Sequence, residues 1–258
     1  YFIVVICLMN YFFYLNPIIQ VLIAGVICFI FTSAGAFLVL LCKNIKQSVF
    51  DGINSISSGI MISAAFFSLL LPAINSTKNV FIVIISFIIG GLFIYISNKL
   101  LEKLDHMETE YNLKRCFLLF TSITLHNIPE GMVVGVAFGG SSIMAAISLT
   151  IAIALQNFPE GAAITFPLNK AGLSKNKSFL FGVLSGIVEP IAAIIGYLLV
   201  LQIKSILPVI LAIASSVMLY VIVLEIIPEC QRSEKKDLMA LLTIIGFSFM
   251  MLLEFILG

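Results

Sequence analysis

The sequence predicts an all-α integral membrane protein that crosses the bilayer with eight helices. Of its 258 residues, 61% are hydrophobic and 10% are charged, whereas soluble domains carry roughly 25% charged residues. A membrane-spanning helix needs about 20 mainly apolar residues. Isolated strands cannot cross lipid, and the alternation typical of a membrane barrel is absent from the sequence, so each long apolar run is predicted to be a helix. Eight runs qualify: Ile18–Cys42, Ile53–Ile74, Val80–Ser97, Cys116–Phe138, Ile143–Pro167, Ser178–Leu201, Ile206–Pro228 and Leu238–Leu257.

Residues 1–16 precede the first run and are too short for a span of ordinary length. They contain Asn10, end at Asn16-Pro17 and lack the basic start of a cleaved signal peptide. We predict an interfacial N-terminal segment here, with a ninth span as the alternative. Residues 17–258 are then expected to form a single eight-span domain.

Basic residues predict the orientation, because cytoplasmic loops of membrane proteins carry an excess of Lys and Arg. With the N-terminus outside, all but two of the 14 Lys and Arg residues fall in inner loops, the exceptions being Lys78 and Lys204. Both termini are therefore expected outside. The longest inner loop, Leu101–Arg115, combines several acids with His106. We interpret it as a solvated loop, with loose collection of metal as the alternative.

Two near-identical polar motifs interrupt the fourth and fifth runs. Leu125–Gly131 reads LHNIPEG, and Leu155–Gly161 reads LQNFPEG. A carboxylate inside a membrane helix costs about 2.5–3.5 kcal/mol even on lenient insertion scales, which favours a functional role. The structural alternative is a pair of proline-kinked packing helices, each with a protonated Glu. That alternative leaves the amides and the duplication unexplained.

Helical geometry places the carboxylate of each motif between two possible ligands. On the helical wheel Glu130 lies between His126 and Asn127, on neighbouring turns. A carboxylate flanked by ligands that point apart can bridge two metal ions. The arrangement repeats with Gln156, Asn157 and Glu160. Two such helices face to face would form a site for one or two divalent cations.

The prolines and glycines of the motifs support this interpretation. Pro129 and Pro159 each remove one helical hydrogen bond, and the carbonyl four residues earlier must find another partner in lipid. An ion or its water can serve as that partner. Gly131 and Gly161, directly after each Glu, leave room for a neighbouring backbone.

Other acidic residues in the runs have several interpretations. Glu189, before Pro190 in the sixth run, is a third deep carboxylate. No Lys or Arg lies at comparable depth, so a metal is favoured over a salt bridge as its counter-charge. Glu225 and Glu229 are either groups on an exit path or interfacial residues, and Glu254 is predicted to be interfacial.

The second run contributes two further candidates. Met61 is either core filler or a soft ligand. Ser68 lies two turns further along on the same face, where a serine more often bonds its own backbone than lines a path. An internal echo links this run to the seventh: Ser57–Met61 precedes Pro72 as Ser215–Met218 precedes Pro228. The two runs cross in opposite directions, as an inverted repeat requires.

Taken together, these residues resemble a known family. His-Asn-x-Pro-Glu-Gly followed by Gln-Asn-x-Pro-Glu-Gly on consecutive spans is typical of the Zrt/Irt-like (ZIP) divalent metal transporters, and Gly-x-x-Glu-Pro on the next span agrees. The Gly59-x-Met61 segment and the end of the second span look like the bacterial GufA-type branch. The resemblance covers roughly residues 17–258. It implies an inverted three-helix repeat, spans 1–3 and 6–8, around spans 4–5, for which an elevator-like movement has been proposed.

The resemblance also implies roles by position. It implies that the second site includes both motif glutamates as bridges, and that Ser68 lies on the path by which the ion enters. Some members carry Asp where this chain has Asn157, so the second site here lacks one negative charge. The implied primary transport site is His126, Glu130, Gln156, Glu160 and Met61. The implied second site is Asn127, Glu130, Asn157, Glu160 and Glu189.

We therefore expect a multi-pass protein of the cell membrane that imports a divalent metal and is not an enzyme. Zinc is the favoured cargo because His and Met suit borderline-soft ions, while carboxylates and amides also suit iron, manganese or cadmium. Expected partners are metal ions and the lipid bilayer, with a homodimer as a candidate assembly. The net charge of +1 argues against nucleic acid.

Two other functions fit the sequence less well. An intramembrane carboxylate-bridged metal enzyme would use Glu-x-x-His on two helices, whereas here the order is His-x-x-x-Glu and the chain holds only two His residues. A metal-sensing receptor would need a signalling domain, which this sequence does not show. Neither alternative accounts for the paired motif as well as transport does.

Overall fold

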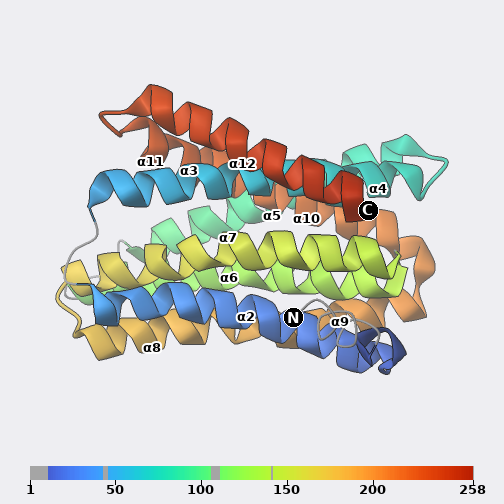
Figure 1. Cartoon of the computed structure of the whole chain (residues 1–258), viewed down its shortest axis with the longest axis horizontal. Coiled ribbons are helices and arrows are strands. Elements are labelled where there is room, and N and C mark those ends of the chain that lie inside the picture. The colour runs from blue at the N-terminus through green and yellow to red at the C-terminus, as the bar shows by residue number, and fades with distance from the viewer. Residues whose placement is uncertain (1–10, 43–45, 106–110, 141, 258) are drawn as a thin grey trace.

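The computed structural model describes residues 11–42, 46–105, 111–140 and 142–257 (Figure 1). Within these ranges, the side chains at 101–105, 111–119, 122, 123, 126, 204, 225, 229 and 257 lie outside the description. The described chain is helical and contains no strand, which confirms the all-α prediction. The longer elements are α2 (Pro17–Leu41), α3 (Gln47–Ser63), α5 (Val80–Asp105), α6 (Tyr111–Gly140), α7 (Ile143–Lys170), α8 (Lys175–Gly186), α9 (Val188–Gln202), α10 (Leu207–Val221) and α12 (Lys236–Leu257).

Seven helical segments are long and apolar enough to cross a membrane among the described residues, with α3 and its continuation, and α8 with α9, each counted as one. The helix α6 carries the first motif and is not one of these seven. Its 30 residues exceed the length of a span, and the side chains of its first part lie outside the description. The structure thus shows a multi-pass helical protein, and the count of eight spans stays a prediction.

Side chains at the helix ends fix where several helices begin and end. The Asn16 side chain accepts a hydrogen bond from Ile18 N (3.0 Å) directly before Pro17, the first residue of α2. Ser142 caps α7 in the same way, through Ala145 N at 3.1 Å. Asn and Ser are preferred N-caps, and Pro suits the first helical position. These caps place the helix starts within a few residues of the predicted runs.

Two bundles make up the fold (Figure 1). We call α2, α6, α7, α8 and α9 the motif bundle, and α3, α5, α10 and α12, with their short continuations, the flanking bundle. Within the motif bundle α2 packs most extensively on α7, and α9 on α6. Within the flanking bundle α3 packs on α12, and α10 on α5. An inverted repeat exchanges spans 1–3 with spans 6–8, and span 4 with span 5. Under this exchange the contact of α2 with α7 corresponds to that of α9 with α6, and the contact of α3 with α12 corresponds to that of α10 with α5.

The echo between the second and seventh spans also has a structural counterpart. The helix α3 passes into a π-helical stretch, η1 (Ala64–Leu70), and then into α4 (Leu71–Asn75), which contains Pro72. The helix α10 passes into a π-helical stretch, η3 (Ile222–Ile226), and then into α11 (Ile227–Gln231), which contains Pro228. A π-helical stretch absorbs a backbone irregularity and is frequent at functional sites. The two spans therefore share a backbone irregularity as well as a sequence pattern.

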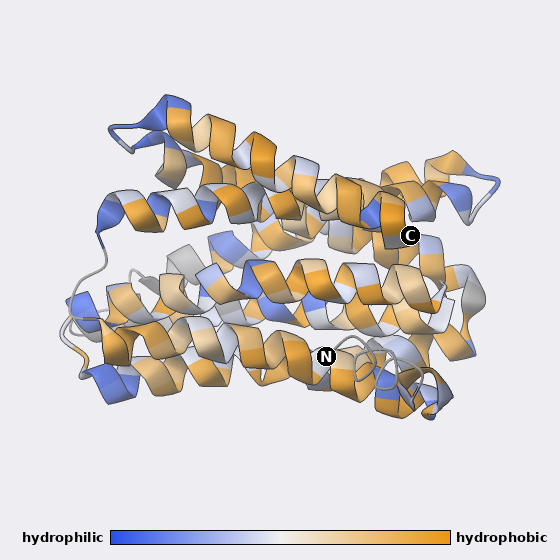
Figure 2. Cartoon of the chain, in the orientation of Figure 1, coloured by the Kyte–Doolittle hydropathy of each residue, from blue (hydrophilic) through white to orange (hydrophobic). Residues whose placement is uncertain are grey.

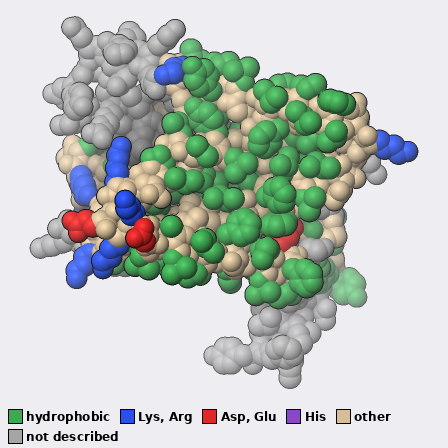
Figure 3. Space-filling model, turned by 90° about the horizontal axis from the view of Figure 1, so that it is seen from above, with side chains coloured by type: hydrophobic (Ala, Val, Ile, Leu, Met, Phe, Trp, Pro, Cys, Tyr) green, Lys and Arg blue, Asp and Glu red, His purple; other side chains and the backbone are tan. Residues whose placement is uncertain are grey.

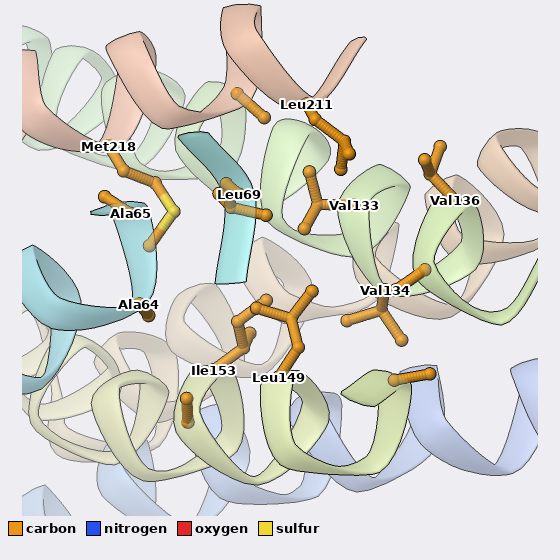
Figure 4. Packing of buried hydrophobic residues seen from close by; sticks show 14 of the residues in the cluster. Ala64, Ala65, Leu69, Val133, Val134, Val136, Leu149, Ile153, Leu211 and Met218 are labelled. Carbon is orange, nitrogen blue, oxygen red and sulfur yellow. The ribbon is translucent and has the colours of Figure 1, made fainter. Parts of the chain in front are cut away.

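Apolar side chains fill the space between the bundles. Leu69 of η1 and Met218 of α10 face Val133 of α6 and Leu149 and Ile153 of α7 (Figure 4). All five are buried. Together with small residues such as Ala64 and Ala65, they form the core that positions the two motif helices against the flanking bundle.

The exposed charged groups lie mainly at the two ends of the molecule. Helices are apolar along most of their length, with hydrophilic residues at their ends and midway along α6 and α7 (Figure 2). Basic side chains concentrate at one end of the face in Figure 3, with an apolar band beside them. The connections α2–α3, α7–α8 and α11–α12 lie at one end in Figure 1, opposite the α4–α5 turn. This distribution is the one that predicted the orientation, and the location of the termini stays a prediction.

Two further expectations concern chain segments only partly described. The predicted loop 101–115 is shorter than expected, because α5 continues to Asp105 and α6 begins at Tyr111, while His106 lies outside the described residues. In the N-terminal segment, Phe12 packs edge-to-face on Phe138, with ring centroids 6.2 Å apart, and its carbonyl accepts from Gln20 Nε2 at 2.8 Å. The interfacial placement of the segment stays a prediction.

Candidate metal centre

The two motifs meet inside the motif bundle. Both α6 and α7 continue as helices through their motif prolines. Asn127, Glu130, Gln156 and Asn157 are all buried. The Gln156 side chain donates to one carboxylate oxygen of Glu130, with Nε2 and Oε1 2.5 Å apart. The sequence predicted two motif helices with their polar groups facing, and this contact confirms it for Glu130 and Gln156.

Each motif glycine allows another backbone to approach, as predicted. A Cβ on Gly161 would collide with the backbone carbonyl of Thr32 in α2. A Cβ on Gly131 would collide with the backbone of Glu189 at the start of α9. The two glycines therefore bring α2 and α9 against the motif helices, and with them the side chains of Thr32 and Glu189.

The Glu189 carboxylate is fully buried and accepts two hydrogen bonds. Its Oε1 accepts from the Thr32 hydroxyl at 2.6 Å, and its Oε2 accepts from Asn157 Nδ2 at 2.8 Å. Both donors are neutral, so these contacts give no support to the salt-bridge interpretation of Glu189. Because Gln156 and Asn157 are adjacent, the polar network runs from Glu130 on α6 through α7 to Glu189 and Thr32.

Asn127 occupies the matching position of the first motif but has a different partner. Its Nδ2 donates to the backbone carbonyl of Ser185 in α8, at 2.9 Å. The carbonyl of Ser185 lies shortly before the break between α8 and α9. Asn127 therefore ties the first motif to the sixth span, as Asn157 ties the second motif to it through Glu189.

Several buried oxygens in this network have no hydrogen-bond donor among the described residues. They are Asn127 Oδ1, Glu130 Oε2, Gln156 Oε1 and Asn157 Oδ1. Each is an acceptor, and a buried polar atom left without a partner costs about 1–3 kcal/mol. Buried acceptors that gather without donors favour a bound cation or its water. The centre thus has the chemistry of a cation site built from carboxylate and carboxamide oxygens.

Other predicted ligands are placed less fully. Glu160 is half-buried on α7, directly before Gly161, and the His126 side chain lies outside the described residues. Met61 is fully buried in the apolar core, on α3. Within the described part of the chain, no three His, Cys, Asp or Glu side chains lie close enough to hold a metal. A metal centre here would accordingly depend on the carboxamides and on His126.

A second polar cluster contains Ser68, Ser148 and Glu254. The Glu254 Oε2 accepts from Ser68 Oγ and from Ser148 Oγ, both at 2.9 Å. A serine at such a position more often bonds its own backbone, but Ser68 donates to a side chain of another span. Glu254 was predicted to be interfacial, but its half-buried carboxylate turns into the protein.

The sequence did not predict a role for Thr32 or Ser148, nor the inward turn of Glu254. Serine and threonine are common in membrane helices and usually bond their own backbone, so nothing in the pattern singles these residues out. The Glu225 and Glu229 side chains, predicted as exit-path or interfacial groups, lie outside the described residues.

Comparisons with known proteins agree with the geometry. The family model described as ZIP Zinc transporter matches residues 108–254, more than half of the chain. Zinc transporter ZIP11 of Xenopus tropicalis is 28% identical, over 94% of this chain and 98% of its own length. Zinc transporter ZIPB of Bordetella bronchiseptica is 29% identical, over 92% of this chain and 81% of its own length. Zinc transporter GufA of Myxococcus xanthus is 30% identical, over 82% of this chain and 88% of its own length. The chain is thus a multi-pass membrane protein that belongs to the ZIP zinc transporter family.

Proposed function

We propose that this protein carries divalent metal ions, with zinc as the favoured cargo, across the cell membrane into the cytosol. The observation that carries the proposal is the set of buried acceptor oxygens on both motifs, Asn127 Oδ1, Glu130 Oε2, Gln156 Oε1 and Asn157 Oδ1, for which the described residues supply no donor. Acceptors without donors suit a cation. The zinc transporters named above, similar over most of this chain, support zinc as the cargo.

The mixed ligand set suits transport. Glu130 supplies a charged oxygen that lacks a donor among the described residues, and Gln156 donates to the other oxygen of the same carboxylate. We assign His126, Glu160 and Met61 to the same primary site by their motif positions. Neutral amides and few charges bind an ion more weakly than a closed Cys and His cage. Weak binding is required because a transported ion must also leave.

The Ser68, Ser148 and Glu254 cluster supports a path of entry from outside. It lies near the C-terminal end of α12, at the end of the molecule opposite the α2–α3 and α7–α8 connections (Figure 1). By the charge distribution, that end faces outward. Glu254 places a negative group there, which attracts a cation, and the two serine hydroxyls supply further oxygens.

The division into two bundles supports a movement of one against the other. The side-chain hydrogen bonds of Asn127, Gln156 and Asn157 stay within the motif bundle. The bundles meet mainly through apolar side chains (Figure 4). Hydrogen bonds cross between them at Ser57, 3.5 Å from the Gln156 carbonyl, and at Ser148. A movement of the motif bundle would therefore carry the hydrogen-bonded residues of both motifs together and separate them from Met61 on α3.

Zinc flux into proteoliposomes loaded with a zinc-sensitive dye tests the proposal. We expect Glu130→Ala and Glu160→Ala to abolish flux, because each removes a carboxylate from the centre. The matched control is Glu234→Ala, which removes an exposed acid outside the spans and should leave flux unchanged. If folded and reconstituted Glu130→Ala and Glu160→Ala variants admit zinc as fast as the unmutated protein, the proposal is wrong.

A further inference from the structure

The two deep carboxylates of the described network differ in how they are satisfied. Glu130 has one oxygen held by Gln156, while its Oε2 has no donor among the described residues. Glu189 has both oxygens held, by Thr32 and by Asn157. A carboxylate can accept from two donors in this way without any cation. Of these two carboxylates, Glu130 is therefore the one with an oxygen that lacks a donor among the described residues.

The hydrogen bonds to Glu189 are short, and its surroundings are closed. The Thr32 hydroxyl has a single proton and two acceptors in reach, Glu189 Oε1 at 2.6 Å and the Cys28 carbonyl at 3.2 Å. The shorter contact, to a carboxylate, takes the proton. A Cβ on Gly186 would lie 3.2 Å from the same oxygen, so backbone also covers that side of the carboxylate. An ion approaching Oε1 would have to displace both neighbours.

Asn157 determines what lies on the other oxygen. Its amide has one donating end, Nδ2, which is directed at Glu189 Oε2 at 2.8 Å. Its Oδ1 is therefore directed away from Glu189, and remains an acceptor for an ion elsewhere in the centre. With Asp at this position, two carboxylates would face each other at that distance and would need a cation or a proton between them. With Asn157, the amide donates to the Glu189 carboxylate, and the two side chains need neither a cation nor a shared proton between them.

We propose that the Asn157 amide and the Thr32 hydroxyl take the place of a second metal ion at Glu189, so that the centre holds one ion. The ion binds at the Glu130 side, and Glu189 acts as a positioning residue that ties α2, α7 and α9 together. This inference rests on the proposed function, because it concerns the number of ions that the transport site holds.

Counting bound metal tests the inference on the purified full chain. Equilibrium dialysis against zinc, followed by elemental analysis, should find one ion per chain in the unmutated protein. Asn157→Asp should bind two, because the second carboxylate replaces the donor with an acceptor. Glu189→Gln should still bind one ion with a dissociation constant within about threefold. A glutamine can accept from Asn157 through its oxygen and donate to the Thr32 hydroxyl, so this variant keeps the network.

A folding readout separates positioning from ligation. Thr32→Val removes the hydroxyl at constant shape and should lower the melting temperature of the metal-free protein, whereas Thr32→Ser should retain it. Zinc should raise the melting temperature by the same increment in the unmutated, Thr32→Val and Glu189→Gln proteins. A smaller increment in Glu189→Gln would identify Glu189 as a ligand and overturn the inference.

The number of bound ions tests the single-ion inference, and the flux tests the proposed function. Two ions in the unmutated protein, one of them lost in Glu189→Gln, overturn the single-ion inference even when flux depends on Glu130. A count of zero in the unmutated protein overturns it as well. Flux that is insensitive to Glu130→Ala overturns the proposed function, whatever the count.

Discussion

Replacing Gly161 by alanine should force α7 away from α2 and weaken the protein around the metal centre. Gly161 faces the backbone of α2, where an added Cβ would collide with the Thr32 carbonyl and lie 2.8 Å from Ala36 N. Real Cβ atoms essentially never come within 3.0 Å of another heavy atom. Both obstacles are backbone atoms of a packed helix, so no side-chain rotation can relieve them.

The size of the effect follows from two opposing contributions. Alanine is favoured over glycine in a helix interior by about 0.8–1.0 kcal/mol. Overpacking a close contact costs about 1–3 kcal/mol, and a backbone obstacle places Gly161 at the upper end. The net loss is then about 2 kcal/mol. For a chain of this size each kcal/mol lowers the melting temperature by about 2–4 °C, so we expect a fall of about 4–8 °C.

Thermal melting in detergent, with zinc flux on the same preparations, measures this prediction. The matched control is Gly52→Ala on α3, where a Cβ would meet Leu242 Cδ1 at an ordinary 3.4 Å and no other atom of the described residues. The control should melt at or slightly above the temperature of the unmutated protein and keep its flux, because alanine raises the helix propensity there without a collision. Gly161→Ala should also lose flux, since the displacement moves Glu160 and Thr32. A Gly161→Ala variant that melts as high as the control would show that the close approach of α7 to α2 at Gly161 does not limit stability.

Three further predictions test the path, the orientation and one helix end. Glu254→Gln keeps an acceptor for its two serine donors but removes the charge. The zinc concentration for half-maximal flux should therefore rise about fivefold, with an unchanged maximal rate. A fall in maximal rate alone would contradict the role of Glu254 in attracting the entering ion. Lys78→Cys and Lys177→Cys, both at exposed positions, should react with an impermeant maleimide from outside and from inside respectively, and the opposite pattern would reverse the predicted orientation. Lys175→Met removes the ammonium that donates to the Cys42 carbonyl at 2.9 Å. The melting temperature of this variant should fall by about 2–4 °C, for a loss of about 1 kcal/mol. An unchanged melting temperature would show that this contact does not stabilise the end of α2.

The helices could be predicted because lipid leaves few alternatives for the backbone. Apolar runs such as Ile143–Pro167 correspond to single helices, here α7, with ends displaced by only a few residues. The larger differences lie where helices leave the apolar region. The helix α5 extends past Ser97 to Asp105, because a helix can continue into polar residues once caps and water satisfy its backbone.

Contacts between helices were harder to predict, because apolar residues in lipid-exposed helices carry little information on which face meets a partner. Packing in membranes depends on small residues and on scattered polar groups. Gly131 and Gly161 could be recognised as points of close approach, but nothing in the sequence named Thr32 as the neighbour of Glu189. Likewise, the partner of Glu254 depends on the rotation of α12, which hydropathy leaves open.

The paired motif shows why duplication in the sequence does not guarantee equivalence in the structure. Asn127 and Asn157 occupy the same motif position, and each is buried with its Nδ2 donating. Asn127 donates to a backbone carbonyl, of Ser185, whereas Asn157 donates to the carboxylate of Glu189. Although α9 packs mainly on α6, which carries the first motif, the Glu189 carboxylate accepts from the amide of the second motif on α7. The same residue is thus a simple tether in one copy and a neutral substitute for a cation in the other.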